Sequence, residues 1–254
     1  VARVPALRVG DEVEGLAACR EGLILVAGPR SSGKRTLLAA FVDLISRTRC
    51  DHIITVERQV GIVHASGGSL VSQREVGRHD DDLLMAARAA AREDPDVLVL
   101  EEITTARIAH VALAASASRL VIAGVSASSA DETVARLTAL CGADGVSQAA
   151  VELSERLRGI VVQVLLPKVG GGRVATREVL LNTPDVAAAI AEGQIARLPG
   201  AIVEGRRQGM ELMDDGLLVH VQNQIVDVQE ASRHVRDRDA FLAALERQGI
   251  DTAT

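Results

Sequence analysis

Aromatic side chains are almost absent from this chain, which contains only Phe41 and Phe241 and has neither tryptophan nor tyrosine. Proteins that bind single-stranded nucleic acid stack the bases on aromatic rings, so the composition argues against that class of function. The chain has 254 residues, 48% of them hydrophobic, which is enough for one large or two modest domains. Its core must therefore consist mainly of alanine, valine, leucine and isoleucine.

Cysteine, positive charge and long apolar runs are also scarce. Cys19, Cys50 and Cys141 form no CxxC pair, so we expect buried thiols in a reducing compartment, without disulfides or a zinc site. The formal net charge of −6 provides no basic field for nucleic acid or an anionic membrane surface. Arg119 interrupts the longest apolar stretch, 111–127, which excludes a membrane span there. Because the first residue is valine, we expect the chain to be a piece of a longer protein.

Short apolar runs alternate with helical patterns along most of the chain, which predicts an α/β fold with a mainly parallel sheet. The predicted strands are 23–27, 53–56, 97–100, 120–123, 160–166 and 174–181. The predicted helices between them are 37–45, 83–91, 108–115 and 131–140. Two hairpins are expected to add an antiparallel edge, one between 62–63 and 70–71 around Gly67-Gly68 and one around Gly170–Gly172.

No strong strand pattern follows Pro184, where short helices are predicted at 187–190, 210–221 and 241–245. We therefore expect two parts, a nucleotide-binding core over 1–182 and a C-terminal helical subdomain over 183–254.

The segment from Gly28 to Lys34 matches the G-x-x-x-x-G-K pattern of a P-loop. It follows an apolar strand and opens a helix, which is the context that the motif requires. Its glycines allow backbone N–H groups to converge on phosphate oxygens, and the lysine neutralises the terminal phosphates. The predicted nucleotide contacts are Gly28, Arg30, Ser31, Ser32, Gly33, Lys34, Arg35 and Thr36.

The residue after the P-loop lysine departs from this pattern. A serine or threonine hydroxyl normally binds Mg²⁺ there, whereas this chain has Arg35, whose guanidinium has donors only. Thr36 does not replace it, because neighbouring helical residues point about 100° apart. The sequence therefore predicts no protein-held metal, even if ATP or ADP binds.

A second carboxylate-bearing segment follows the strand at 97–100, which ends in Glu101 and Glu102. Apolar residues followed by acids are typical of a Walker-B strand, which delivers a carboxylate to the edge of the sheet beside the P-loop. The alternative is a solvated helix start, because helix N-termini favour acids.

Several motifs together resemble the type IV pilus retraction ATPases (PilT-like), nearly along the whole chain and in the order of that family. They are residues 22–34, SQREVG at 72–77, REDPDV at 92–97, GGGRVA at 170–175, NTP at 182–184 and GRRQGM at 205–210. The four-cysteine zinc insertion of the related secretion-assembly ATPases is absent, which favours the retraction branch.

The resemblance implies a RecA-like motor that works as a hexameric ring at the cytoplasmic base of a pilus machine. It implies PilT-like subunits as ring partners, in a homo- or hetero-hexamer, and a pilus platform protein in the inner membrane. It also implies an upstream domain, and since these 254 residues do not include it, we expect a fragment or a truncated paralogue. No nucleic acid and no direct membrane insertion are expected, so the chain would be cytoplasmic and reach the inner face of the membrane only through partners.

Carried over residue by residue, the resemblance places catalytic roles on Glu102, the Walker-B glutamate, and Glu57, in the family's acidic box. The aspartate expected after Glu57 is Arg58, and the histidine of a third motif is Ser126. The glycine expected before Glu102 is Glu101. The departures thus fall at catalytic positions, and losing one electrostatic contact typically slows catalysis by about 10²–10³.

Arg35 and Glu101 are both unusual, and both are expected at the position of the metal. We therefore expect the guanidinium to pair with the carboxylate there, with an exposed Arg35 as the alternative. Ser31 replaces a family glycine, so a positive φ at this position would cost about 1–2 kcal/mol.

Two other charged segments favour simpler interpretations. His79 and the three following aspartates predict a solvated loop, with an aspartate capping the helix from Leu83. Arg233, Arg236 and Arg238 alternate with acids and predict a solvated face.

The sequence as a whole predicts a PilT-like subunit that keeps the fold but has lost most of its hydrolytic machinery, a pseudo-ATPase. The alternative is an active retraction motor of twitching motility in which Glu102 polarises water and Glu57 assists. A DNA-translocating relative is disfavoured by the acidic charge balance and the lack of aromatics.

Overall fold

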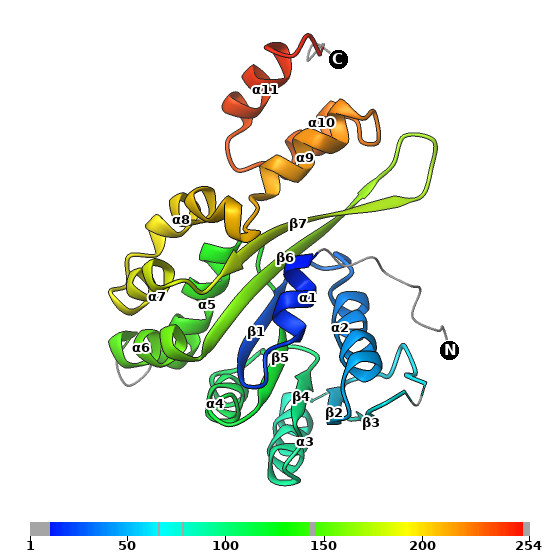
Figure 1. Cartoon of the computed structure of the whole chain (residues 1–254), viewed down its shortest axis with the longest axis vertical. Coiled ribbons are helices and arrows are strands. Elements are labelled where there is room, and N and C mark those ends of the chain that lie inside the picture. Colours follow the sequence, from blue (N-terminus) through cyan, green and yellow to red (C-terminus); the bar gives the residue numbers. More distant parts are fainter. Residues whose placement is uncertain (1–10, 66, 78, 143–145, 251–254) are drawn as a thin grey trace.

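The computed structural model describes residues 11–65, 67–77, 79–142 and 146–250. Its centre is a seven-stranded sheet in the order β3-β2-β4-β5-β1-β6-β7 (Figure 1). The strands are β1 Gly22–Ala27, β2 His52–Glu57, β3 Leu70–Glu75, β4 Val97–Leu100, β5 Leu120–Val125, β6 Leu157–Pro167 and β7 Arg173–Leu181. Every pairing is parallel except that of β6 with β7. The predicted α/β class with a mainly parallel sheet is confirmed.

Helices cover the sheet and continue beyond its last strand. They are α1 Asp11–Ala17, α2 Lys34–Thr48, α3 Asp80–Arg92, α4 Ala106–Ala115, α5 Ala130–Cys141, α6 Val146–Arg156, α7 Pro184–Ala191, α8 Leu198–Glu204, α9 Met213–Gln222, α10 Val228–Ser232 and α11 Arg238–Glu246. The sequence predicted most of them but not α1, α6, α8 and α10. Helices α7–α11 follow β7 without a further named strand in the part described, and the division of the chain at residue 182 stays a prediction.

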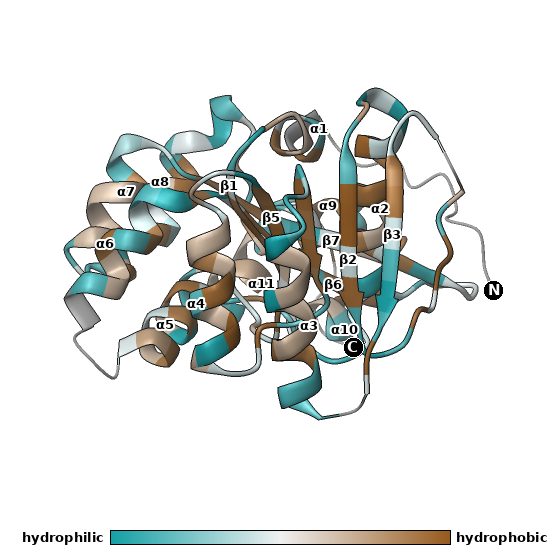
Figure 2. Ribbon diagram, turned by 90° about the horizontal axis from the view of Figure 1, so that it is seen from below, coloured by the Kyte–Doolittle hydropathy of each residue, from teal (hydrophilic) through white to brown (hydrophobic). Residues whose placement is uncertain are grey.

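The central strands are apolar on both faces, as buried parallel strands must be. Alternate residues of β1 divide between two packed clusters, with Leu23 and Leu25 in one and Ile24 and Val26 in the other. The first cluster lies under α3–α6 and reaches into α7–α9, while the second lies under α1 and α2. Figure 2 shows these hydrophobic strands between the helical layers. Because both faces of the central strands are filled, the polar side chains that bear on the site lie at the ends of these strands and on β6 and β7.

The expected hairpin around Gly67-Gly68 is wrong. Strand β3 pairs in parallel with β2, so a crossover and not a tight turn leads into it. The glycines serve a close approach to the end of α2: the N–H of Gly68 donates to the carbonyl of Ser46 over 2.9 Å. A Cβ on Gly67 would lie 2.7 Å from the Ser46 hydroxyl. The hairpin around Gly170–Gly172 is confirmed, with β6 antiparallel to β7.

Two further expectations need correction. Helix α3 begins at Asp80, so the three aspartates lie in its first turn, and His79 occupies the capping position without a side-chain cap. Acids in this turn suit the positive end of the helix, so no loop is needed to explain them. Of the cysteines, only Cys141 is buried, whereas Cys19 is half-buried and Cys50 is exposed.

Among the described helices, none combines the length and the apolar character that crossing a membrane requires.

Candidate functional site

The P-loop connects β1 to α2 at the carboxyl edge of the sheet. Gly33 has a φ of 85°, a left-handed conformation that favours glycine. At Gly28 the neighbouring chain is too close for a side chain, because a Cβ would lie 2.4 Å from the carbonyl oxygen of Gln163. Helix α2 begins directly after Gly33, with no side-chain cap and no acid in its first turn. These uncapped N–H groups form the anion-binding end that the motif predicts.

Gln163 fixes the loop from the neighbouring strand. Its side chain is buried on β6, and its Nε2 donates to the carbonyl of Ser32 over 2.9 Å. Its Oε1 in turn accepts from Nε of Arg177 on β7 over 3.0 Å. Sequence reasoning did not select Gln163, although a lone amide inside the apolar run 160–166 was a visible signal.

Ser31 carries the strain that the sequence predicted. Its φ is 65°, which places a residue with a side chain in the left-handed region. This conformation costs about 1–2 kcal/mol for most residues other than glycine. Strain of this kind is found at ligand sites, where the surrounding structure over-determines the backbone.

A pocket lies over the P-loop and is lined by residues 29–35 together with Glu101, Glu102, Ser126, Leu165 and Arg173. Of the predicted contacts, Gly28 forms the base of the loop, and Thr36 does not line this pocket.

Lys34 is bound to its own loop and to the end of β5. Its Nζ donates to the carbonyls of Gly28 over 2.5 Å and Pro29 over 3.2 Å, and to the Ser126 hydroxyl over 3.4 Å. The same hydroxyl donates to the carboxylate of Glu102. Burial lowers the pKa of Lys34, and the negative charge of Glu102 partly offsets this. Ser126 therefore joins the lysine and the Walker-B glutamate in one polar chain.

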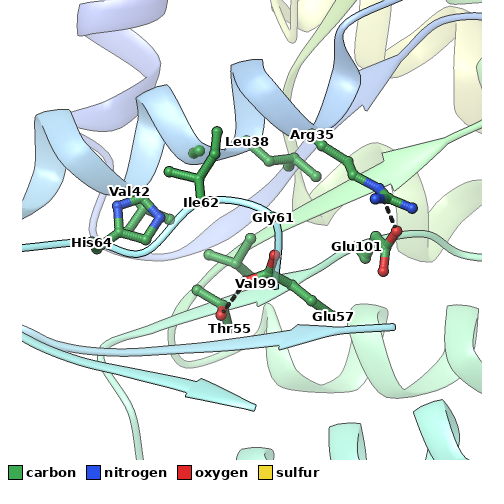
Figure 3. A pocket seen from close by; sticks show the side chains of 11 residues that line it. Arg35, Leu38, Val42, Thr55, Glu57, Gly61, Ile62, His64, Val99 and Glu101 are labelled. Carbon is green, nitrogen blue, oxygen red and sulfur yellow. Dashed lines mark hydrogen bonds and ion pairs between the residues drawn. The ribbon is translucent and has the colours of Figure 1, made fainter. Parts of the chain in front are cut away.

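Arg35 and Glu101 form the predicted pair. The Nε of Arg35 lies 2.7 Å from Oε1 of Glu101 (Figure 3). The second carboxylate oxygen accepts from the backbone N–H of Arg58. Glu101 is buried, which excludes the solvated helix start, and α4 begins only at Ala106. Because 59% of the Arg35 side chain is exposed, the pair stabilises the fold by at most about 1 kcal/mol. Its importance is geometric, since the guanidinium of Arg35 and the N–H of Arg58 together engage both oxygens of the carboxylate.

Glu57 lies on the other side of this pair. Its carboxylate accepts from the Thr55 hydroxyl over 2.7 Å and from Nε2 of Gln73 over 3.3 Å. It lines a small, mostly apolar cavity between α2 and β2, which also contains Arg35 and Glu101 (Figure 3). Glu57 does not line the pocket over the P-loop, so the structure does not bring the two predicted catalytic glutamates into one pocket.

The residues of this pocket do not fit Mg²⁺. A magnesium site needs oxygen ligands in octahedral geometry. The hydroxyl position holds Arg35, both oxygens of Glu101 are engaged, and Glu102 accepts from Ser126. Across the described residues, no group of three acidic, histidine or cysteine side chains is placed to hold a metal ion. A phosphate fits better, because the loop, the helix end and the lysine are all in place.

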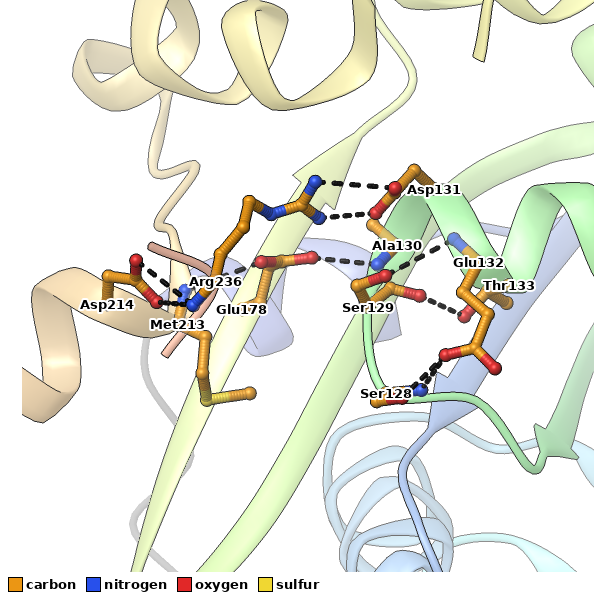
Figure 4. Close-up of polar contacts among 10 residues, drawn as sticks. All are labelled: Ser128, Ser129, Ala130, Asp131, Glu132, Thr133, Glu178, Met213, Asp214 and Arg236. Atoms are coloured by element: carbon orange, nitrogen blue, oxygen red, sulfur yellow. Dashed lines mark hydrogen bonds and ion pairs between the residues drawn. The ribbon is translucent and has the colours of Figure 1, made fainter. Parts of the chain in front are cut away.

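A second polar cluster lies beside the P-loop, where the C-terminal helices meet the core (Figure 4). Glu178 on β7 is only 2% exposed, and its carboxylate accepts from the N–H of Ala130 over 2.7 Å and of Met213 over 3.4 Å. These are the first residues of α5 and α9. Arg236 reaches across to form two hydrogen bonds with Asp131, one of 3.3 Å. Arg236 is exposed, as its local sequence suggested, with 41% of its side chain accessible, but it also forms this ion pair with a distant residue.

Charges and burial act in opposite directions in this cluster. Burial raises the pKa of Glu178, against the hydrogen bonds from Ala130 and Met213. Burial also acts to raise the pKa of Asp131, but hydrogen bonds from Arg236 and Ser129 leave it below the ordinary value.

Residues 8–250 match the protein family described as Type II/IV secretion system protein. The chain belongs to this family. It is 36% identical over 209 residues to the type IV pilus retraction ATPase PilT of Pseudomonas aeruginosa, covering 82% of this chain and 61% of that protein. It is 32% identical over 237 residues to the twitching motility protein of Neisseria gonorrhoeae, covering 92% and 63%. The chain thus spans less than two thirds of the length of these relatives.

A solved structure of the pilus retraction motor PilT with bound ADP has the same fold, with a TM-score of 0.84 and 32% identity. The structural match covers 97% of this chain and 69% of the PilT chain. The RecA-like fold and the place among PilT-like secretion ATPases, both implied by the motifs, are confirmed. The family match does not distinguish an active motor from a degenerate one, because that depends on single residues such as Arg35.

Proposed function

We propose that this chain is a PilT-like pseudo-ATPase, a subunit that keeps the nucleotide pocket of its family without the ability to hydrolyse ATP. The observation that carries the proposal is the pair of Arg35 with Glu101, in which a guanidinium stands at the position of the metal-binding hydroxyl and both oxygens of Glu101 are engaged. Phosphoryl transfer in P-loop proteins depends on Mg²⁺ held by a hydroxyl at the position of Arg35. A chain without that ligand retains binding and loses the charge stabilisation of the transition state.

The state of Glu102 supports the same proposal. A glutamate that polarises water needs an oxygen directed at the nucleophile. Here one oxygen accepts from Ser126, which also receives a hydrogen bond from Lys34. Glu57, the second predicted catalytic residue, is held by Thr55 and Gln73 outside the pocket.

The biological setting is proposed from the relatives. We infer that the chain forms a homo- or hetero-hexamer with PilT-like subunits and acts with the platform protein of a pilus or secretion machine. It would then work in the cytoplasm at the inner face of the membrane. There it would change the activity of a ring in which other subunits hydrolyse ATP. Light scattering of the protein alone, and mixed with an active PilT-like paralogue, tests for such a ring.

Release of phosphate from ATP tests the proposed lack of hydrolysis. The purified protein with ATP and Mg²⁺ is expected to release phosphate no faster than its Lys34→Ala variant, which lacks the P-loop cation. The active PilT of Pseudomonas aeruginosa, assayed in parallel, establishes that the conditions support hydrolysis. Turnover that exceeds the Lys34→Ala background would show an active retraction motor and overturn the proposal.

A further inference from the structure

The pocket over the P-loop has more positive than negative side chains. Four cations line it, Arg30, Lys34, Arg35 and Arg173, against the carboxylates of Glu101 and Glu102. Glu101 is paired with Arg35 at 2.7 Å. Glu102 is joined to Lys34 through the Ser126 hydroxyl, and its charge is the one that acts on the pKa of this lysine. Two guanidinium groups remain without a carboxylate.

These two arginines approach the pocket from different elements. Arg30 belongs to the P-loop itself, and Arg173 is the first residue of β7, paired with Pro167 of β6 next to the turn of the hairpin. Both side chains are exposed, and within the described ranges neither has a hydrogen-bond or ion-pair partner. Arginines that line one pocket from two different elements, each with an unused planar fork of donors, suit phosphate oxygens.

The charge of this pair equals that of a divalent ion. In a working P-loop site, Mg²⁺ brings two positive charges to the terminal phosphates. Here Arg30 and Arg173 supply two positive charges from the protein. A metal–nucleotide complex would bring its own ion into a pocket in which Arg35 replaces the metal-binding hydroxyl and is paired with Glu101. It would also leave less negative charge for the arginines.

We propose that this pocket binds a polyphosphate anion in its metal-free form, with Arg30 and Arg173 as contacts to the phosphates. The inference rests on the proposed function, which interprets the P-loop as a ligand site without hydrolysis, and it names the ligand class of that site. A second, independent feature is the start of α2, whose first turn has no side-chain cap and no acid. Its N–H groups and those of the loop converge on the same pocket.

Calorimetric titration of the purified chain with ATP tests the metal preference. One titration contains EDTA, and the other contains Mg²⁺ in excess over ATP. Binding is expected to be about fivefold to tenfold tighter in EDTA, because one lost charge-assisted contact corresponds to roughly tenfold in affinity. Equal binding in the two buffers, or tighter binding with Mg²⁺, overturns the inference.

Variants of the two arginines test the contacts. Arg173→Ala and Arg30→Ala are each expected to weaken binding of ATP in EDTA about tenfold, and much less in Mg²⁺. Arg197→Ala is the matched control, since Arg197 is exposed in a 3-10 helix and bonds only to Gln194 among the residues described. Circular dichroism confirms that each variant is folded. Unchanged binding by Arg173→Ala contradicts the assigned contact.

Tripolyphosphate distinguishes the two sources of this chemistry. Affinity equal to that of ATP identifies the phosphate chain as the ligand, whereas weaker binding than ATP identifies a nucleotide. The failure of this inference differs from that of the proposed function. Phosphate release above the Lys34→Ala background contradicts the pseudo-ATPase, while a preference for Mg²⁺ without turnover contradicts the metal-free ligand alone.

Discussion

Two buried glutamates, one on each side of the P-loop, show how differently this fold can hold a negative charge. Glu101 at the end of β4 is bound by an exposed arginine side chain and one backbone N–H. Glu178 on β7 is bound by backbone N–H groups at the starts of two helices, with Arg236 nearby. Helix N-termini supply rigid donors and partial positive charge, whereas an exposed guanidinium is free to leave.

The different partners of the two glutamates suggest different roles, with Glu178 important for stability and Glu101 for ligand binding. Glu178 joins α5 of the core to α9 of the C-terminal helices, so its partners are parts of the fold itself. Asp214 adds to this junction by accepting from the N–H of Arg236 over 3.0 Å. Glu101 instead lies where a ligand would enter, and its arginine partner can rearrange without disturbing a helix. We therefore expect the junction to determine stability and the P-loop pocket to determine binding.

The largest expected effect is on the junction. Glu178→Ala leaves two buried N–H groups without an acceptor and is expected to lower the free energy of unfolding by about 3 kcal/mol. Glu101→Ala, its counterpart in the pocket, is expected to cost about 1 kcal/mol, because Arg35 then turns to solvent. Urea unfolding followed by circular dichroism measures both. Equal losses would contradict the distinction between the two regions.

The pH dependence of stability provides a second test. Burial raises the pKa of Glu178 above its ordinary value of 4.5, so the folded state holds the proton more tightly than the unfolded state. Its contribution to stability is therefore complete below pH 4.5 and falls as the pH rises to the raised pKa. Within this window the slope is at most about 1.4 kcal/mol per pH unit. The Glu178→Gln variant has no titrating carboxyl group at this position. The free energy of unfolding of the variant relative to that of the wild type should therefore rise with pH. A constant difference from pH 4 to 7 would contradict the assignment.

The smallest expected effect concerns strain in the P-loop. Ser31→Gly relieves the positive φ but gives the unfolded chain more freedom, for a net gain of about 0.5 kcal/mol. Gln224, with a φ of 55°, is a matched position outside the pocket. Gln224→Gly is expected to give a similar gain, and of the two variants only Ser31→Gly should change the affinity for ATP. Thermal unfolding and calorimetry measure the two properties, and a loss of stability in Ser31→Gly would show that the loop is not strained.

Local patterns in the sequence predicted much of the sheet and the P-loop, because buried strands and glycine-rich loops are encoded by neighbouring residues. Even the pair of Arg35 with Glu101 followed from two unusual residues at known positions in a RecA-like fold. The missed helix α6 had a usable signal as well, since Val146, Ala149, Ala150 and Leu153 recur at helical spacing.

Features that depend on distant partners were not predictable in this way. A pair of glycines is compatible both with a tight turn and with close packing against another segment. For Gly67-Gly68 only the position of α2 shows that the second applies. Arg236 alternates with acids locally, but its partner Asp131 is 105 residues away. Glu57 is a similar case: its place in a motif suggested catalysis, while Thr55 and Gln73 hold its carboxylate outside the pocket.

The hydrogen bond from Gln163 to the P-loop has a mechanical consequence. Successive residues of a strand face opposite sides, so sliding β6 by one residue would withdraw the amide from Ser32 altogether. The same strand continues into the hairpin, whose tip is tied to the C-terminal helices by the bond from the N–H of Val169 to the carbonyl of Ile225. A neighbouring subunit that pulls on this tip would therefore shift β6 and strengthen or weaken the hydrogen bond from Gln163 to the P-loop. It would act on the proposed phosphate site from a distance, without covering it.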